Sequence, residues 1–216
     1  MPQPNTFLFD LDGTLLDSLE LILESYHHTL EVHRGVRYDD EVWIAGIGTP
    51  LRNQLGPYAE DAEDLEAMVA TYRDYNFAHH DALIKPFDGI VEALEALSKN
   101  GTALGVVTSK GRTGAHRGLR HCGLDGYFQA VVAANDVERH KPHPEPVLHA
   151  LELLDRGPEG TVFIGDSPFD MAAGRDAGVQ TAAALWGPFE RETLEQHSPD
   201  YWLTDPTEIP SLNGAI

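Results

Sequence analysis

Cysteine is nearly absent from this chain, which has one in its 216 residues, Cys122. A single cysteine rules out an internal disulfide and is typical of proteins from reducing compartments. Long apolar runs are lacking, and the first residues do not pair a basic segment with an apolar one. A membrane span needs about 20 consecutive apolar residues, and a secretory signal needs both segments. We therefore expect a soluble, cytoplasmic protein in which Cys122 packs as a small hydrophobic side chain.

Basic residues are scarce too. Fifteen lysines and arginines face 35 acidic residues, so the formal net charge is −20. A surface this acidic repels nucleic acid and anionic membranes, and we expect neither as a partner. A protein of this composition that handles an anion must therefore create a local positive field. A metal ion, a lysine or the N-terminus of a helix can supply one.

Strands and helices alternate strictly from residue 85 onward. Buried strands are predicted at 103–108, 130–134, 161–165, 180–184 and 201–204, and helices at 88–100, 112–122, 144–154, 169–177 and 190–196. A further apolar strand opens the chain just before Asp10. Such alternation predicts an α/β fold, a Rossmann-like parallel sheet with helices on both faces.

The segment between residues 17 and 84 has a different pattern, without any predicted strand. Apolar residues recur at helical spacing over 18–34 and 59–79, and shorter helical stretches follow Asp39 and Pro50. A connection between a strand and the next helix is usually only a few residues long. We therefore predict an all-helical cap domain at 17–84, inserted after the first strand of a core made of residues 1–16 and 85–216.

Two carboxylates follow the opening strand. Asp10 and Asp12 come directly after it, and Gly13 and Thr14 allow a sharp turn beside a hydroxyl. Ligands of open parallel sheets bind beyond the carboxyl ends of the strands, so these acids are placed for chemistry. A calcium-binding loop is excluded because Leu21 stands where such a loop needs its glutamate.

Three later segments supply partners for these acids. Thr108 and Ser109 end one strand, Lys141 lies in a proline-rich loop, and Asp166 and Asp170 follow another strand. Alone, the Thr-Ser pair favours an ordinary helix cap and Lys141 a solvated surface lysine. Four aspartates gathered at one sheet edge need cations, and Mg²⁺ with Lys141 suits them best because Mg²⁺ prefers oxygen ligands.

With these four motifs in this order, the chain resembles the haloacid dehalogenase superfamily over nearly its whole length, in the phosphoglycolate phosphatase-like branch with a helical cap. The resemblance implies that Asp10 is the nucleophile that forms an aspartyl-phosphate, and that Asp12 is the general acid and then the base. Family dehalogenases lack an acid at the position of Asp12, which favours phosphoryl transfer here.

The remaining roles follow from the same resemblance. Thr108 or Ser109, together with Lys141, would hold phosphoryl oxygens. Asp10, the backbone carbonyl of Asp12, and Asp166 would hold Mg²⁺. Asp170 would steady Lys141 or the water shell of the metal.

The expected substrate is a small phosphorylated metabolite. Phosphoglycolate is the first choice, and pyrophosphate or a nucleotide comes next. A β-phosphoglucomutase-like mutase shares the core motifs, but such mutases carry a histidine at the position aligned with Ile22. A phospho-acceptor switch resembling a receiver domain is a third alternative, although it has no use for Asp12 or for a cap.

The cap would close over the site and exclude water. The break at residues 48–52 resembles the substrate-contacting loop of family caps, so Thr49 and Arg52 are candidate substrate-binding residues, with Arg52 as a plain surface residue left open. We expect the histidine pairs at 27–28 and 79–80 on the solvated surface, and Trp43 and Trp186 as packing residues. A monomer or a weak homodimer is expected.

Overall fold

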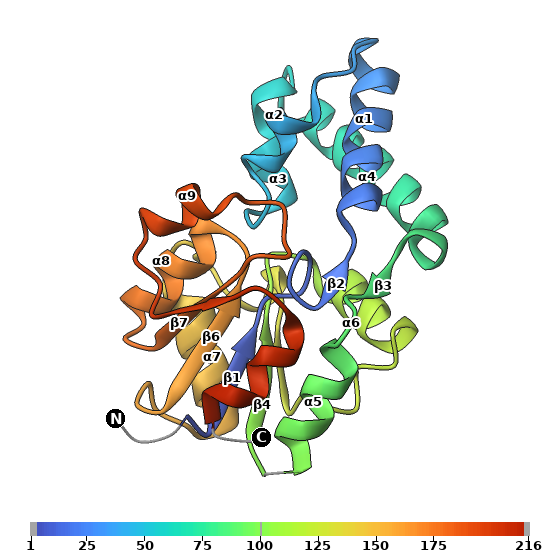
Figure 1. Cartoon of the computed structure of the whole chain (residues 1–216). Coiled ribbons are helices and arrows are strands. Elements are labelled where there is room, and N and C mark those ends of the chain that lie inside the picture. The colour runs from blue at the N-terminus through green and yellow to red at the C-terminus, as the bar shows by residue number, and fades with distance from the viewer. Residues whose placement is uncertain (1–3, 100, 214–216) are drawn as a thin grey trace.

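The computed structural model describes residues 4–99 and 101–213, and a six-stranded parallel sheet forms its centre (Figure 1). The strand order is β5-β4-β1-β6-β7-β8. The strands are β1 (Thr6–Phe9), β4 (Ala103–Val107), β5 (Ala130–Val132), β6 (Thr161–Gly165), β7 (Gln180–Ala184) and β8 (Tyr201–Leu203). The predicted α/β fold with a parallel sheet is confirmed.

Helices cover both faces of the sheet because successive strand residues point to opposite sides. Phe7 and Phe9 of β1 pack with residues of α5 (Ile90–Lys99) and α6 (Arg112–His121) in one hydrophobic cluster. Leu8, between them, packs on the other side with residues of α7 (Glu145–Leu154) and α8 (Pro168–Asp176). A short helix, α9 (Arg191–Glu195), and a 3-10 helix at Pro206–Asn213 complete this part of the chain.

The strand order places a switch point between β1 and β6. From β1 the chain moves outward to β4 and β5, and then returns to the other side of β1 as β6. Ligands of open parallel sheets bind at the carboxyl ends of the strands where the order reverses in this way. Asp10 and Asp166 follow these two neighbouring strands, so the topology brings them together.

A group of helices, the cap, lies above the carboxyl ends of the strands (Figure 1). They are α1 (Leu19–Arg34), α2 (Asp40–Ile44), α3 (Leu51–Leu55) and α4 (Ala62–Leu83), with a 3-10 turn at Gly56–Tyr58. Their apolar faces form a hydrophobic cluster of their own, in which Trp43 stacks on Tyr26 with ring centroids 4.5 Å apart. Trp43 is fully buried, so its predicted packing role is confirmed.

A two-stranded antiparallel ribbon joins the cap to the core. It consists of β2 (Leu16–Asp17) and β3 (Lys85–Pro86), the segments by which the chain enters and leaves the cap. The prediction of no strand from residue 17 onward is therefore wrong at Asp17, because two residues are too short to show any periodicity. The ribbon forms only when both connections meet in space. The division into core and cap domains itself stays a prediction.

Most predicted elements agree with the structure to within a few residues. The strands at 161–165 and 180–184 match β6 and β7. The long cap helix, α4, begins later than predicted because Asp61 caps it: the Asp61 side chain accepts a hydrogen bond from the Asp64 amide at 2.9 Å. The helix also extends further, to Leu83. The predicted end of α5 at residue 100 lies outside the described residues. No helix in the described part of the chain is both long and apolar enough to cross a membrane.

Candidate active site

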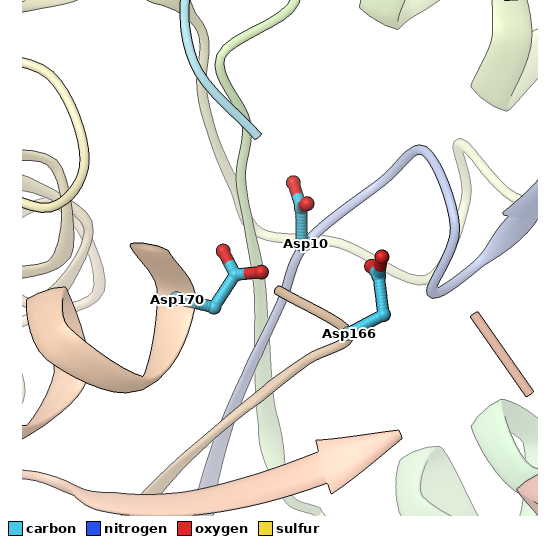
Figure 2. Close-up of side chains that lie close together, drawn as sticks. All are labelled: Asp10, Asp166 and Asp170. Carbon is cyan, nitrogen blue, oxygen red and sulfur yellow. The ribbon is translucent and has the colours of Figure 1, made fainter. Parts of the chain in front are cut away.

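Three buried aspartates lie together beyond β1 and β6. Asp10 follows β1, Asp166 follows β6, and Asp170 lies in the first turn of α8, and each offers an oxygen within 4.8 Å of the others. Figure 2 shows the three carboxylates gathered around a common space. Asp10 also lines a cavity of about 470 Å³ between the core and the cap. The structure thus brings three of the four predicted aspartates into one cluster.

Lys141 is the cation of this cluster. Its side chain is buried, and its ammonium lies 2.9 Å from Asp10 Oδ1 and 2.6 Å from Asp170 Oδ1. A third contact reaches the carbonyl oxygen of Val107 at 3.3 Å. The alternative of a solvated surface lysine is therefore wrong. A lysine ammonium has three donors, so these contacts engage all of them.

Asp170 is held by the start of α8. Its Oδ2 accepts hydrogen bonds from the Ser167 amide at 3.0 Å and from the Ser167 hydroxyl at 2.5 Å. The Asp170 amide in turn donates to the Ser167 hydroxyl oxygen at 3.3 Å. This reciprocal arrangement is a capping box, which satisfies free amides at a helix N-terminus. Since its other oxygen, Oδ1, contacts Lys141, Asp170 holds the lysine in position.

Asp166 has one oxygen in use and one without a partner. Oδ1 accepts the Thr14 hydroxyl at 2.6 Å, whereas Oδ2 is buried with no hydrogen-bond partner among the described residues. Gly13 borders this oxygen with a positive φ of 86°, and a Cβ there would lie 2.5 Å from it. A buried oxygen without a partner is costly. Its carboxylate chemistry and its position among acids fit a metal ion.

Burial dominates the protonation of the cluster. It raises the pKa of Asp10 to about 7, with Lys141 opposing the rise and Asp170 adding to it. Burial, and then Asp170 and Asp10, also raise the pKa of Asp166 well above its usual value. Burial lowers the pKa of Lys141, but Asp10 and Asp170 more than offset this and raise it overall. When all three acids are ionised, one ammonium leaves two negative charges, which a divalent cation would neutralise.

Asp12 is not part of the three-aspartate cluster, and its side chain contacts Ser18 and Lys110 instead. Asp12 Oδ1 accepts a hydrogen bond from the Ser18 hydroxyl at 2.7 Å. The Lys110 ammonium donates to both carboxylate oxygens of Asp12, at 2.8 Å to Oδ1 and 3.0 Å to Oδ2. The carbonyl of Asp12 is its predicted metal ligand, and the residue also lines the cavity. Sequence reasoning missed Lys110. The available signal was a lysine directly after the hydroxyl pair at the end of β4.

The hydroxyl pair does not cap α6, because Gly111 occupies the cap position. Thr108 is buried at the end of β4, and its hydroxyl oxygen accepts the Lys110 amide at 3.1 Å. Ser109 donates its hydroxyl to the Gly48 carbonyl at 2.6 Å, a contact from core to cap. Both residues line the cavity. The helix-cap alternative for this pair is therefore wrong.

The predicted cap residues lie at the cavity wall. Thr49 lines it, while its hydroxyl donates to Gly46 O at 2.7 Å within the cap. Arg52 also lines it, with 47% of its side chain exposed, and forms a 2.6 Å hydrogen bond to Glu66. Arg73 is a further cation in this wall. The roles of Thr49 and Arg52 in substrate binding stay predictions.

Two cap histidines expected on the surface are buried. His27 contacts Asp40 at 2.7 Å, and His80 contacts Asp81 at 2.7 Å. The signal was present in the sequence, because His27 lies four residues after Leu23, on the buried face of α1. Burial also lowers the pKa of His80. Trp186, as predicted, packs against the core, and its indole donates to the Thr14 carbonyl at 2.9 Å.

Comparison with known proteins gives one consistent result. The model of the haloacid dehalogenase-like hydrolase family matches residues 7–184. Pyrophosphatase PpaX of Anoxybacillus flavithermus is 41% identical over 210 residues, 97% of each chain, and that of Bacillus mycoides is 40% identical over 212 residues, 98% of each. A haloacid dehalogenase-like hydrolase from Streptococcus pneumoniae superposes with a TM-score of 0.82 at 28% identity, covering 96% of this chain and 97% of that one. The chain therefore belongs to the haloacid dehalogenase-like hydrolase family and is an enzyme of its phosphatase group.

Proposed function

We propose that this protein is a Mg²⁺-dependent phosphohydrolase that works through an aspartyl-phosphate on Asp10, with inorganic pyrophosphate as its substrate. One observation carries the proposal. The Asp10 carboxylate borders a cavity at the carboxyl end of β1, with the Lys141 ammonium 2.9 Å away. A nucleophilic carboxylate beside a fixed cation is what phosphoryl transfer requires.

The residues divide the reaction between them. An Asp10 oxygen forms a bond to phosphorus while the bond from phosphorus to the leaving oxygen breaks. The electron pair of the broken bond departs with the leaving group. Lys141 holds Asp10 in place and adds positive charge next to it. Thr108 has a hydroxyl proton to donate to a phosphoryl oxygen, because its oxygen accepts the Lys110 amide. Asp12 would take a proton from the water that releases phosphate from Asp10.

The donor set suits Mg²⁺. Asp10, Asp166 and the carbonyl of Asp12 would hold the ion, whereas Asp170 would support Lys141. The buried Oδ2 of Asp166, which has no partner among the described residues, is the observation that favours a metal there. When bound, the ion would neutralise charge on the phosphoryl oxygens.

Pyrophosphate is favoured over an ester for two reasons. Four strongly basic side chains line the cavity of a protein whose net charge is −20, namely Arg52, Arg73, Lys110 and Arg112. Three of them pair with acidic residues, Lys110 with Asp12, Arg52 with Glu66 and Arg112 with Asp136. Four cations in one wall nevertheless suit a substrate with two phosphate groups. The two curated relatives described above are pyrophosphatases, and each aligns with nearly the whole chain.

Phosphoglycolate is the second candidate, because the same cations can bind its carboxylate. A sugar phosphate mutase is less well supported. The cavity wall carries Ile22 where such mutases have a histidine, and an isoleucine cannot transfer a proton.

A phosphate-release assay tests the proposal. Pyrophosphate should be hydrolysed with a higher kcat/KM than phosphoglycolate, phenyl phosphate or nucleotides, and chelation of divalent ions should stop turnover until Mg²⁺ is restored. Acid quenching during turnover of labelled pyrophosphate should trap a hydroxylamine-sensitive phosphoryl group on the wild-type protein and none on Asp10→Asn. A trapped group on Asp10→Asn would show that the nucleophile is another residue. Turnover that ignores chelation would refute the metal site.

A further inference from the structure

The reaction proposed for this site assigns no role to Lys110. It follows Thr108 and Ser109 at the end of β4 and lines the cavity, yet only 14% of its side chain is exposed. Its ammonium contacts both oxygens of Asp12, at 2.8 and 3.0 Å, across 98 positions of sequence. A lysine held this firmly beside the reacting groups acts on the substrate or on Asp12.

The two lysines of the site differ in how many donors they have left. Lys141 contacts Asp10, Asp170 and the Val107 carbonyl, so its three donors are engaged. Both contacts of Lys110 fall on a single carboxylate, which leaves one donor without a partner among the described residues. Lys110 can therefore bind an oxygen in the cavity without releasing Asp12, whereas Lys141 cannot bind one without losing a contact.

The other cations of the wall pair with acidic residues or are exposed, as Arg73 is. Arg112 pairs with Asp136 and has 60% of its side chain exposed, and Arg52 pairs with Glu66. Lys110 is less exposed than either and is tied directly to Asp12. A charge in a largely buried position is screened less by salt and acts more strongly on an anion.

The stem of Lys110 passes close to Gly114 in α6. A Cβ at Gly114 would lie 3.2 Å from Lys110 Cε and 3.5 Å from its Cδ and Cγ. The helix thus leaves out a side chain where the stem passes, and the stem carries the ammonium to Asp12. This close approach gives a way to move the ammonium without removing it.

We propose that Lys110 binds the phosphate group that leaves. The enzyme therefore prefers substrates with a second phosphate as leaving group to substrates with an uncharged alcohol as leaving group. The inference rests on the function proposed above and names the residue that sets its substrate class. When the bond from the bridging oxygen to the attacked phosphorus breaks, the electron pair stays on the departing phosphate. The free donor of Lys110 stabilises the charge that accumulates there.

The test compares two substrates in three variants. Lys110→Met removes the charge and keeps the stem, Lys110→Arg keeps the charge, and Lys99→Met is the control because Lys99 is exposed on α5 and pairs with Glu95. A charge-assisted hydrogen bond corresponds to roughly a 10- to 100-fold effect. Lys110→Met should therefore reduce the ratio of kcat/KM for pyrophosphate to kcat/KM for phenyl phosphate by that factor. Lys110→Arg should restore part of the preference, and Lys99→Met should leave it unchanged.

A residue that only orients Asp12 would behave differently. Lys110→Met would then lower kcat/KM for both substrates by the same factor, and this result would overturn the proposal. Gly114→Ala is the second variant, because its methyl group displaces the ammonium without removing it. It should reduce the preference for pyrophosphate by a smaller factor, and an unchanged preference in both Lys110→Met and Gly114→Ala would reject the proposal.

Calorimetric binding of methylenediphosphonate in the presence of Mg²⁺ separates this inference from the proposed function. This analogue carries two phosphonate groups that the enzyme cannot separate. If the wild-type protein does not hydrolyse pyrophosphate, the proposed substrate is contradicted. Weaker binding of the analogue by Lys110→Met, by about 10-fold or more, would still support Lys110 as the site of the second group, and equal binding would refute it.

Discussion

The stability of the metal-free protein should fall as the pH rises from about 4 to about 7. Burial raises the pKa of Asp10 from 3.8 to about 7 in the folded protein. A group that binds its proton more tightly when folded destabilises the folded state once the pH exceeds its unfolded pKa. A difference of about 3 pKa units corresponds to roughly 4 kcal/mol of unfolding free energy. Of this, about 3 kcal/mol should be lost between pH 5 and pH 8.

Urea unfolding at pH 5 and pH 8 measures this loss, with chelator present in one series and Mg²⁺ in the other. Asp10→Asn cannot ionise, so its unfolding free energy should lack the decrease that Asp10 causes. The comparison of the two proteins also removes the contribution of His80, whose lowered pKa makes stability rise with pH in part of this range. Carboxyl groups such as Asp81, with a pKa lowered to about 2, act below this range.

Mg²⁺ should reverse the effect, because metal ligands bind in their deprotonated form. The stabilisation by Mg²⁺ should therefore be larger at pH 8 than at pH 5, and binding near pH 6 should release protons. If wild-type protein and Asp10→Asn show parallel pH dependences in the presence of chelator, Asp10 does not titrate as its burial implies, and this reasoning is wrong.

Three further predictions concern the turn, the cap and the cavity wall. Gly13→Ala should weaken Mg²⁺ binding and lower the unfolding free energy by about 1–3 kcal/mol, because a Cβ there collides with Asp166 at a positive φ; calorimetry that finds wild-type affinity would contradict this. Trp43→Ala should cost about 3–5 kcal/mol in urea unfolding, since Trp43 is fully buried in the cap cluster. Arg52→Ala should raise KM for phosphoglycolate more than for phenyl phosphate, and equal changes would remove Arg52 from recognition.

Local sequence patterns were enough to predict the carboxylates of the candidate site and their placement at strand ends. A buried strand followed by acids occurs twice, at Asp10 and at Asp166, and a parallel sheet brings such ends to one edge. The structure places these residues with Asp170 within 4.8 Å, as this reasoning requires. Lys141, isolated in its loop, was assigned to the site because the gathered aspartates need cations, and the order of the four motifs then supplied its expected role.

The contacts that sequence reasoning missed connect distant segments or depend on which helix face becomes buried. The pairing of β2 with β3 joins residues about 70 positions apart and leaves no trace in either two-residue segment. The histidine pairs at 27–28 and 79–80 were expected on the solvated surface because adjacent residues diverge on a helix and do not face one another. His27 and His80 are buried because α1 and α4 turn the faces that carry them inward, and Asp40 and Asp81 provide their contacts.

By itself, the sequence determined the alternation of strands and helices, the order of the motifs and the types of side chain available for phosphoryl transfer. These properties depend on residues within a few positions of one another, where backbone geometry dictates spacing. Only the tertiary structure decided that Lys110 pairs with Asp12, that Lys141 has no donor to spare, and that Asp166 keeps an oxygen without a partner in the described part of the chain. Donor and acceptor counts depend on every group that folding brings close, and no local pattern encodes them.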